Sequence, residues 1–102
     1  MKSFLATLIL ISSSLSSQCF AQDLARGGEL YKQCIACHGD KGDGNVAQKA
    51  PRISGQHDWY TLKQLQDMKA GVIRKNPVMT PFLSKLSEQD MKDLAAYISQ
   101  LK

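Results

Sequence analysis

The chain has 102 residues, of which 43% are hydrophobic and 22% are charged, and its formal net charge is +4 at pH 7. This length allows one small domain, and the composition is that of a globular protein rather than a disordered chain. The basic residues are scattered without a run or interleaved aromatic residues, so the charge favours a solvated surface over nucleic-acid binding.

The first 21 residues have the pattern of a secretory signal peptide. Lys2 precedes an apolar run from Phe4 to Leu15, and small residues end at Ala21. The run is too short to cross a bilayer of about 30 Å as a helix. We therefore predict a leader in residues 1–21 that directs the protein to the periplasm, and a domain in residues 22–102 without stable membrane insertion.

Removal of this leader would leave two cysteines, Cys34 and Cys37. Cys19 would depart with the leader. Lipid attachment at Cys19 is the alternative interpretation, but residues 16–18 lack the pattern typical of such a site. The mature chain would keep 12 Lys and Arg against 9 Asp and Glu, a net charge of +3, because only Lys2 is lost.

The first helical pattern of the predicted domain lies at residues 24–33, LARGGELYKQ. It contains Gly27 and Gly28, and each glycine costs about 1 kcal/mol relative to alanine in a helix. Glycines retained at this cost indicate close contact with another element.

Two further helices are predicted after it. Asp58 is expected to cap the second, residues 59–70, which ends before Gly71. A capping box is expected at residues 87–90, before the C-terminal helix. The apolar positions that recur at helical spacing are Trp59, Leu62, Leu65 and Met68 in the second helix, and Met91, Leu94, Ala95, Ile98 and Leu101 in the last.

Long loops join these helices. GDKGDGN (residues 39–45) and APRISGQ (residues 50–56) are rich in turn residues, and NPVMTP (residues 76–81) is predicted to be extended. A domain of this size with such loops buries little apolar surface, since domains below roughly 70–80 residues usually need a staple. We therefore expect a group other than protein to complete the core.

Two cysteines and a histidine lie together in CIACHG, residues 34–39. A redox dithiol is disfavoured because no strand precedes the pair. A structural zinc site needs four ligands, and outside the motif only His57 remains as a histidine or cysteine donor. C-x-x-C-H is the attachment signature of haem c: Cys34 and Cys37 bind two vinyl groups and His38 becomes the proximal iron ligand.

Three segments resemble a bacterial class I cytochrome c of the small single-haem type, similar to cytochrome c-553 or to one domain of cytochrome c4. They are GGELYKQCIACHGDKGDG, PRISGQ and LSEQDMKDLAAYISQLK. The resemblance implies an all-α class I cytochrome c fold, with three or four helices and long loops wrapped around one covalently attached haem. It also implies that Gly27 or Gly28 contacts Tyr97, and that the Pro51 carbonyl accepts a hydrogen bond from the proximal imidazole.

The second axial ligand is predicted to be Met79. Pro77 and Pro81 stiffen the loop around it, which reduces the entropy lost in presenting one side chain at a fixed place. The resemblance also implies a distal methionine from a loop before the last helix. His57 is the rival donor, whereas Met68 and Met91 lie on apolar helix faces, where packing in the core is the simpler interpretation.

Iron held by protein on both sides leaves no site for substrate, so the predicted function is electron transfer without enzymatic activity. We expect a monomeric periplasmic carrier between a membrane-bound donor and an oxidase or reductase. A cytochrome subunit of a dehydrogenase complex is the alternative, and a haem sensor or peroxidase would need an open sixth position. Trp59, Tyr60 and Arg74 are candidates for contact with the haem propionates.

Overall fold

The computed structural model describes residues 9–11 and 22–102. The predicted leader therefore lies outside the described residues, except for residues 9–11. The domain is all-α, as predicted, and no strand occurs in the part that the structure describes. Its helices are α1 (Leu24–Tyr31), α2 (Ile35–His38), α3 (Asp58–Ala70), α4 (Thr80–Leu83) and α5 (Glu88–Ser99).

The number of helices exceeds the predicted three or four because α2 and α4 are single turns of 4 residues each. A pattern with a period of 3.6 residues cannot be recognised over so short a segment. In the part of the chain with assigned structure, no helix is both long enough and apolar enough to cross a membrane.

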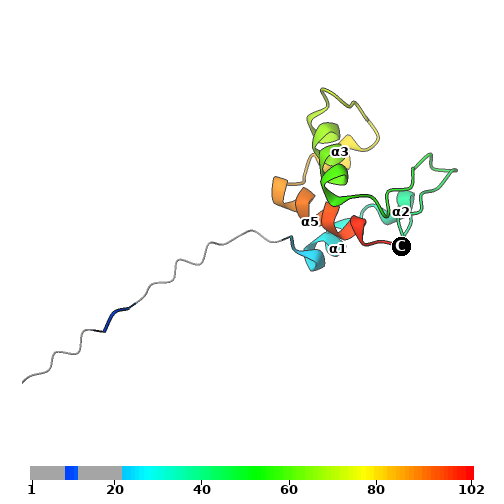
Figure 1. Cartoon of the computed structure of the whole chain (residues 1–102). Coiled ribbons are helices and arrows are strands. Elements are labelled where there is room, and N and C mark those ends of the chain that lie inside the picture. Colours follow the sequence, from blue (N-terminus) through cyan, green and yellow to red (C-terminus); the bar gives the residue numbers. More distant parts are fainter. Residues whose placement is uncertain (1–8, 12–21) are drawn as a thin grey trace, which may run out of the picture.

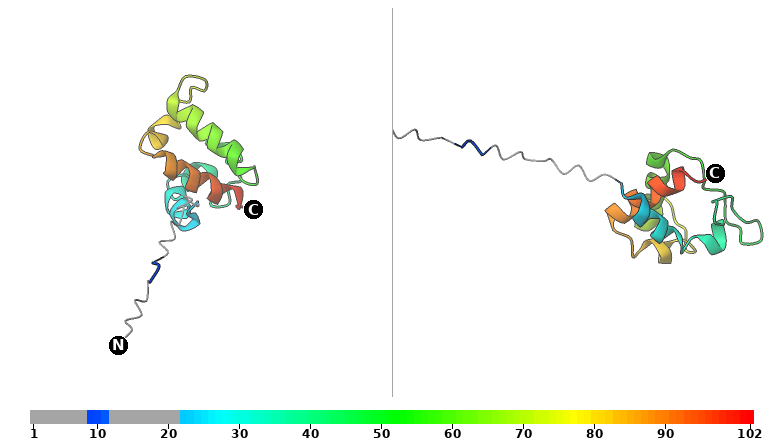
Figure 2. Two further views of the ribbon diagram at one scale, coloured as in Figure 1. Left: turned by 60° about the vertical axis from the view of Figure 1, so that its left-hand side comes forward. Right: turned by 90° about the horizontal axis from the view of Figure 1, so that it is seen from below.

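Helix α5 lies at the centre of the domain and packs against both α1 and α3 (Figure 1, Figure 2). Its contact with α1 is close because Gly27 has no side chain. A Cβ atom at Gly27 would lie 2.2 Å from the Asp93 backbone oxygen and 2.8 Å from the Tyr97 Cβ. The predicted contact of the glycine pair with Tyr97 is thus confirmed, and the backbones of the two helices nearly touch.

The N-terminus of α5 has the predicted capping box. The Ser87 hydroxyl accepts the Asp90 N–H at 3.0 Å, and the Asp90 carboxylate accepts the Ser87 N–H at 3.1 Å. These hydrogen bonds, together with nearby Arg26, lower the pKa of the Asp90 carboxyl below its usual value. Four of the five predicted apolar positions, Met91, Leu94, Ala95 and Ile98, are buried. Leu101 lies beyond the end of α5 and is partly buried against the core.

Helix α3 differs from the prediction in its first turn. Asp58 is the first helical residue rather than the cap, and its carboxylate accepts the N–H of Trp59 at 2.7 Å. Trp59 is 64% exposed, so its assignment to the apolar face was wrong. The buried face consists of Thr61, Leu65 and Met68, because the first turn of the helix extends past the core.

The segment at residues 76–81 is less extended than predicted. Met79 has helical backbone angles, φ −83° and ψ −31°, and immediately precedes α4. Pro81 lies in the first turn of α4, where its fixed φ suits the helix and its missing N–H is not needed. Pro81, one of the two prolines predicted to stiffen the loop, therefore lies in the first turn of a helix.

Tyr31 connects the end of α1 to the segment that follows α2. Its side chain is 1% exposed, its ring lies 5.5 Å from that of Tyr97, and its hydroxyl donates a hydrogen bond to the Gly39 carbonyl. Burial raises the pKa of Tyr31 to about 12, with further contributions from Cys34, Tyr97 and Asp40. The neutral phenol is therefore the form that the fold requires.

Substitution of Gly27 by alanine tests the helix crossing. We expect Gly27→Ala to lower the free energy of unfolding by roughly 3 kcal/mol, the upper end of the range for overpacked cores, since backbone atoms must move. Gly28→Ala is the matched control. A Cβ there would lie 3.2 Å from the Tyr97 ring, which can shift, and alanine gains helix propensity. Equal effects of the two substitutions in denaturant unfolding would contradict the close crossing.

Tyr31→Phe tests the link between α1 and Gly39. We expect the free energy of unfolding at pH 7 to fall by about 1 kcal/mol, because one buried hydrogen bond is lost. Since the pKa of Tyr31 rises from 10.0 to about 12 on folding, its contribution is complete below pH 10 and is lost as the pH rises towards 12. The difference between wild type and variant should therefore shrink over this interval.

Tyr97→Phe is the control for this experiment, because within the described residues the Tyr97 hydroxyl has no hydrogen-bond partner. Denaturant unfolding at several pH values checks the result. A difference between wild type and Tyr31→Phe that stays constant up to pH 12 would show that the phenol is not held by Gly39.

Candidate haem site

The two thiols and the imidazole are placed by the single turn of α2. The Cys34 N–H donates to the Tyr31 carbonyl at 2.8 Å, and the His38 N–H donates to the Cys34 carbonyl at 2.9 Å. This spacing of three and four residues brings Cys34, Cys37 and His38 to one side of the turn. The motif is therefore a continuation of α1, held at both ends by Tyr31.

Cys34 and Cys37 form no disulfide, and burial raises the pKa of Cys34 to about 11, with a smaller contribution from Cys37. A redox dithiol requires the opposite shift, because the thiolate is its reactive form. A zinc site is also unsupported: no group of three or more His, Cys, Asp or Glu side chains suited to a metal occurs in the described ranges. Haem attachment is the chemistry that remains.

His38 is oriented by the loop between α2 and α3. The ring is 5% exposed, and its Nδ1 lies 2.9 Å from the Pro51 carbonyl oxygen. A carbonyl can only accept a hydrogen bond, so Nδ1 carries the proton and Nε2 keeps the free electron pair that binds a metal. The carbonyl contact implied for Pro51 is therefore present, and it fixes both the tautomer and the plane of the ring.

Figure 1 shows that the loop between α2 and α3 turns back on itself, and backbone contacts hold its two branches together. The Gly44 N–H donates to the His38 carbonyl at 2.8 Å, and an isolated antiparallel bridge joins Asn45 to Ala50. Gly44 has φ +84°, and a Cβ there would lie 2.7 Å from the Ala50 oxygen. Only glycine allows the two branches of the loop to approach so closely.

One cavity of about 440 Å³ unites the predicted site residues. This volume lies within the range of roughly 300–1,000 Å³ found for cofactor sites. The cavity is mostly apolar. Its lining includes Cys34, Cys37 and His38 from the motif, Met79 from the loop before α4, and Leu65, Met68, Leu83, Leu86, Leu94 and Ile98 from the helices.

The charged groups in the lining also suit haem. Lys49, Arg52 and Arg74 line the cavity, and no aspartate or glutamate occurs among the described residues that form its wall. A haem with two propionates needs an apolar enclosure with positive charge at one edge. The residues present therefore fit the group in the polarity of the lining and in the iron donors that they offer.

The other predicted candidates divide into two groups. Tyr60 and Arg74 line the cavity, whereas Trp59 does not. His57 is exposed, stacks on Trp59 with the ring centres 5.8 Å apart, and is also absent from the cavity wall in the part of the chain described. The geometry thus favours Met79 over His57 as the second donor.

Met68 and Met91 are both buried in the core, as predicted. Met68 also lines the cavity, so it packs against whatever fills that space. Sequence reasoning missed Arg52, which follows Pro51 and donates a hydrogen bond from its Nε to the Ser54 hydroxyl at 3.1 Å. In the sequence, only its position beside Pro51 indicated that Arg52 lies near the site.

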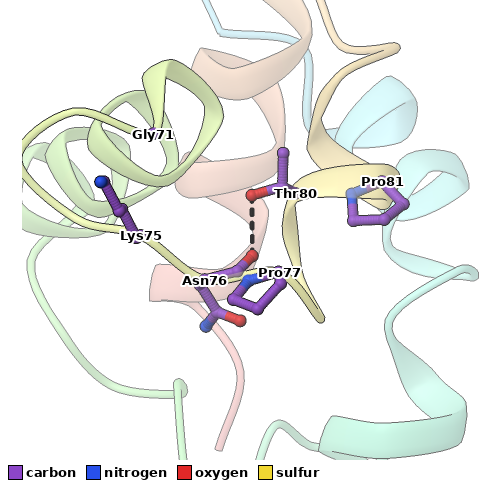
Figure 3. Close-up of a pocket in the computed structure, with 6 residues that line it drawn as sticks. All are labelled: Gly71, Lys75, Asn76, Pro77, Thr80 and Pro81. Carbon is purple, nitrogen blue, oxygen red and sulfur yellow. Dashed lines mark hydrogen bonds between the residues drawn. The ribbon is translucent and has the colours of Figure 1, made fainter.

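A second hollow of about 420 Å³ lies next to the loop that carries Met79, residues 76–79, and opens to solvent (Figure 3). It is lined by Gly71, Lys75, Asn76, Pro77, Thr80 and Pro81. The hydrogen bond drawn between Thr80 and the Asn76 carbonyl closes the turn that leads into α4 (Figure 3). This hollow contains none of the predicted haem ligands.

Comparison with known proteins agrees with this geometry. A family model described as Cytochrome c matches residues 24–102. Cytochrome c4 of Stutzerimonas stutzeri is 39% identical over 110 residues, which cover 100% of this chain and 52% of that protein. Cytochrome c-553 of Helicobacter pylori is 40% identical over 73 residues, which cover 72% of this chain and 75% of that protein.

The solved structure of reduced recombinant cytochrome c4 from Pseudomonas stutzeri has a TM-score of 0.74 and 42% sequence identity to the chain, over 80% of this chain and 47% of that one. The chain thus spans about half the length of the cytochrome c4 proteins that it matches. A cytochrome c domain with a C-x-x-C-H motif carries covalent haem c, so the predicted cofactor is confirmed along with the fold. The chain belongs to the cytochrome c family.

Proposed function

We propose that the chain is a periplasmic electron carrier with one haem c, bound covalently by Cys34 and Cys37 and ligated axially by His38 and Met79. The observation that supports this proposal most strongly is the single cavity that all four side chains line. Met79 is remote from the other three in the sequence, yet it lines the same cavity.

Of the side chains in this chain, Cys34 and Cys37 would hold the haem covalently. Each S–H would add across one vinyl double bond and form one thioether. No oxidant is needed, because the thiol and the vinyl group together contain every atom of the thioether.

The two axial donors decide what the site can do. His38 offers Nε2 because the Pro51 carbonyl occupies Nδ1–H, and Met79 offers a neutral thioether sulfur. The bound haem supplies one-electron chemistry, which methionine ligation and an apolar wall poise towards the reduced form. Protein ligands on both sides leave no position for oxygen or peroxide, so the residues support outer-sphere electron transfer.

The cationic part of the wall completes the binding. Lys49, Arg52 and Arg74 all line the cavity and would offer positive charge to two propionates, with no aspartate or glutamate among the described lining residues. Arg74 is itself held by the Gln64 side-chain oxygen, which restricts its position beside α3. These residues therefore orient the group in the cavity, while the apolar helix faces exclude water.

The proposed location is the periplasm and the proposed partners are a membrane-bound donor and an oxidase or reductase. The leader pattern in residues 1–21 and the family match that begins at residue 24 support secretion. Carriers of this kind meet their partners through small, short-lived interfaces. Recovery of the native protein as a free monomer would support this role, whereas stable co-purification with a flavin, molybdenum or copper subunit would indicate a dehydrogenase complex.

Met79→Ala tests the ligation. We expect the weak red absorption band from thioether sulfur to ferric iron to disappear. The reduction potential should also fall, by on the order of 0.1 V, since axial ligands set haem potentials over about 0.8 V. Visible spectroscopy of the oxidised protein and a redox titration measure the two effects.

Met91→Leu is the matched control, because it replaces a buried core methionine outside the cavity with a side chain of similar volume. We expect its band and potential to match the wild type. Persistence of the band in Met79→Ala would refute the proposed ligand.

A further inference from the structure

Asn76 organises the backbone on which Met79 lies. Its side-chain oxygen accepts the N–H of Val78 at 3.2 Å and the N–H of Met79 at 3.1 Å. Pro77, which lies between Asn76 and Val78, has no N–H. The two N–H groups that follow Asn76 in this turn are therefore both bound by the same oxygen. Asparagine is suited to this role because its side chain reaches the backbone two and three residues further on.

The main chain of Asn76 closes the same turn from the other side. Its carbonyl oxygen accepts the Thr80 N–H at 2.9 Å and lies 2.7 Å from the Thr80 hydroxyl (Figure 3). Met79 is therefore enclosed by hydrogen bonds on both sides: its own N–H is bound to the Asn76 side chain, and the next residue is bound to the Asn76 backbone.

The turn is also tied to the end of α3. The Thr80 hydroxyl lies 3.2 Å from the Met68 carbonyl oxygen, and the Asn76 side-chain nitrogen lies 3.7 Å from the Met68 sulfur. Met68 is buried in the core and lines the cavity. The loop at residues 76–79 is thus anchored to helix α3 rather than to another loop.

We propose that Asn76 is a positioning residue that holds the Met79 sulfur in place as an axial ligand against competing ligands. The inference rests on the proposed role of Met79. A thioether is a neutral donor with no net charge to attract ferric iron. The fraction of molecules in which the sulfur is bound therefore depends on how far the loop can move when the sulfur dissociates. Preorganised backbone reduces the entropy cost of each rebinding.

The chain offers a matched control in a second loop. The Asn45 side-chain oxygen accepts the N–H of Ala47 at 2.9 Å and that of Gln48 at 3.4 Å. The hydrogen-bond pattern resembles that of Asn76, but this loop carries neither proposed axial ligand; its backbone bridge to Ala50 supports Pro51, on the His38 side of the site. A substitution at Asn45 therefore removes the same kind of interaction without releasing Met79.

The experiment measures the affinity of the oxidised holoprotein for imidazole, which competes with Met79 for the iron. We expect Asn76→Ala to bind imidazole about tenfold more tightly than the wild type, because two hydrogen bonds to the loop are lost. Asn45→Ala should bind it as the wild type does. Asn76→Asp keeps the acceptor oxygen for both N–H groups and should restore most of the wild-type resistance.

Met79→Ala distinguishes a failure of this inference from a failure of the proposed function. If Met79→Ala binds imidazole no more tightly than the wild type, Met79 is not the ligand and the proposed function is wrong. If Met79→Ala binds tightly but Asn76→Ala matches the wild type, the ligation stands and the role of Asn76 is refuted. An equal gain in Asn45→Ala and Asn76→Ala also refutes it, since the effect is then general loosening.

Should Asn76→Ala fail to incorporate haem, Thr80→Val takes its place. This substitution keeps the shape of the side chain and removes the hydroxyl contacts to the Met68 and Asn76 carbonyl oxygens. We expect imidazole to bind severalfold more tightly than to the wild type. An unchanged affinity would overturn the proposal.

Discussion

The close crossing of α1 and α5 at Gly27 is the constraint on which the rest of the domain depends. It brings the two backbones so near that a Cβ at Gly27 would overlap the Asp93 carbonyl. From this crossing, α1 delivers Tyr31, which fixes the turn bearing Cys34 and His38. The same α5 presents Leu94 and Ile98 as a wall of the cavity. Attachment site and wall are thus positioned by one helix contact.

The two proposed axial donors, His38 and Met79, lie on segments that are held in place with little regular structure. His38 is buried and its Nδ1 contacts the Pro51 carbonyl, while Met79 is held by the side chain and the backbone of Asn76. In both loops prolines restrict the backbone, and an asparagine side-chain oxygen accepts two nearby backbone N–H groups. In the proposed function, donors fixed on both sides of the iron would distinguish an electron carrier from a haem that reacts with substrate.

Local signals made much of this predictable from the sequence. The capping box and the apolar period of α5 are contained within the helix itself, and the spacing of Cys34, Cys37 and His38 specifies haem attachment without knowledge of the fold. The short helices and the exposure of Trp59 could not be predicted, because a single turn has no period and burial depends on where the core ends. The role proposed for Asn76 requires distances that only the folded loop provides.

The central claim is that the protein itself occupies both axial positions, and carbon monoxide tests it most directly. The ligand binds ferrous haem wherever the sixth position is open or easily vacated. Adding it to the reduced native protein should leave the visible spectrum unchanged, because Met79 retains its place. Ready formation of a carbon monoxide complex under native conditions would contradict the account and indicate a sensor or a catalyst instead of an electron carrier.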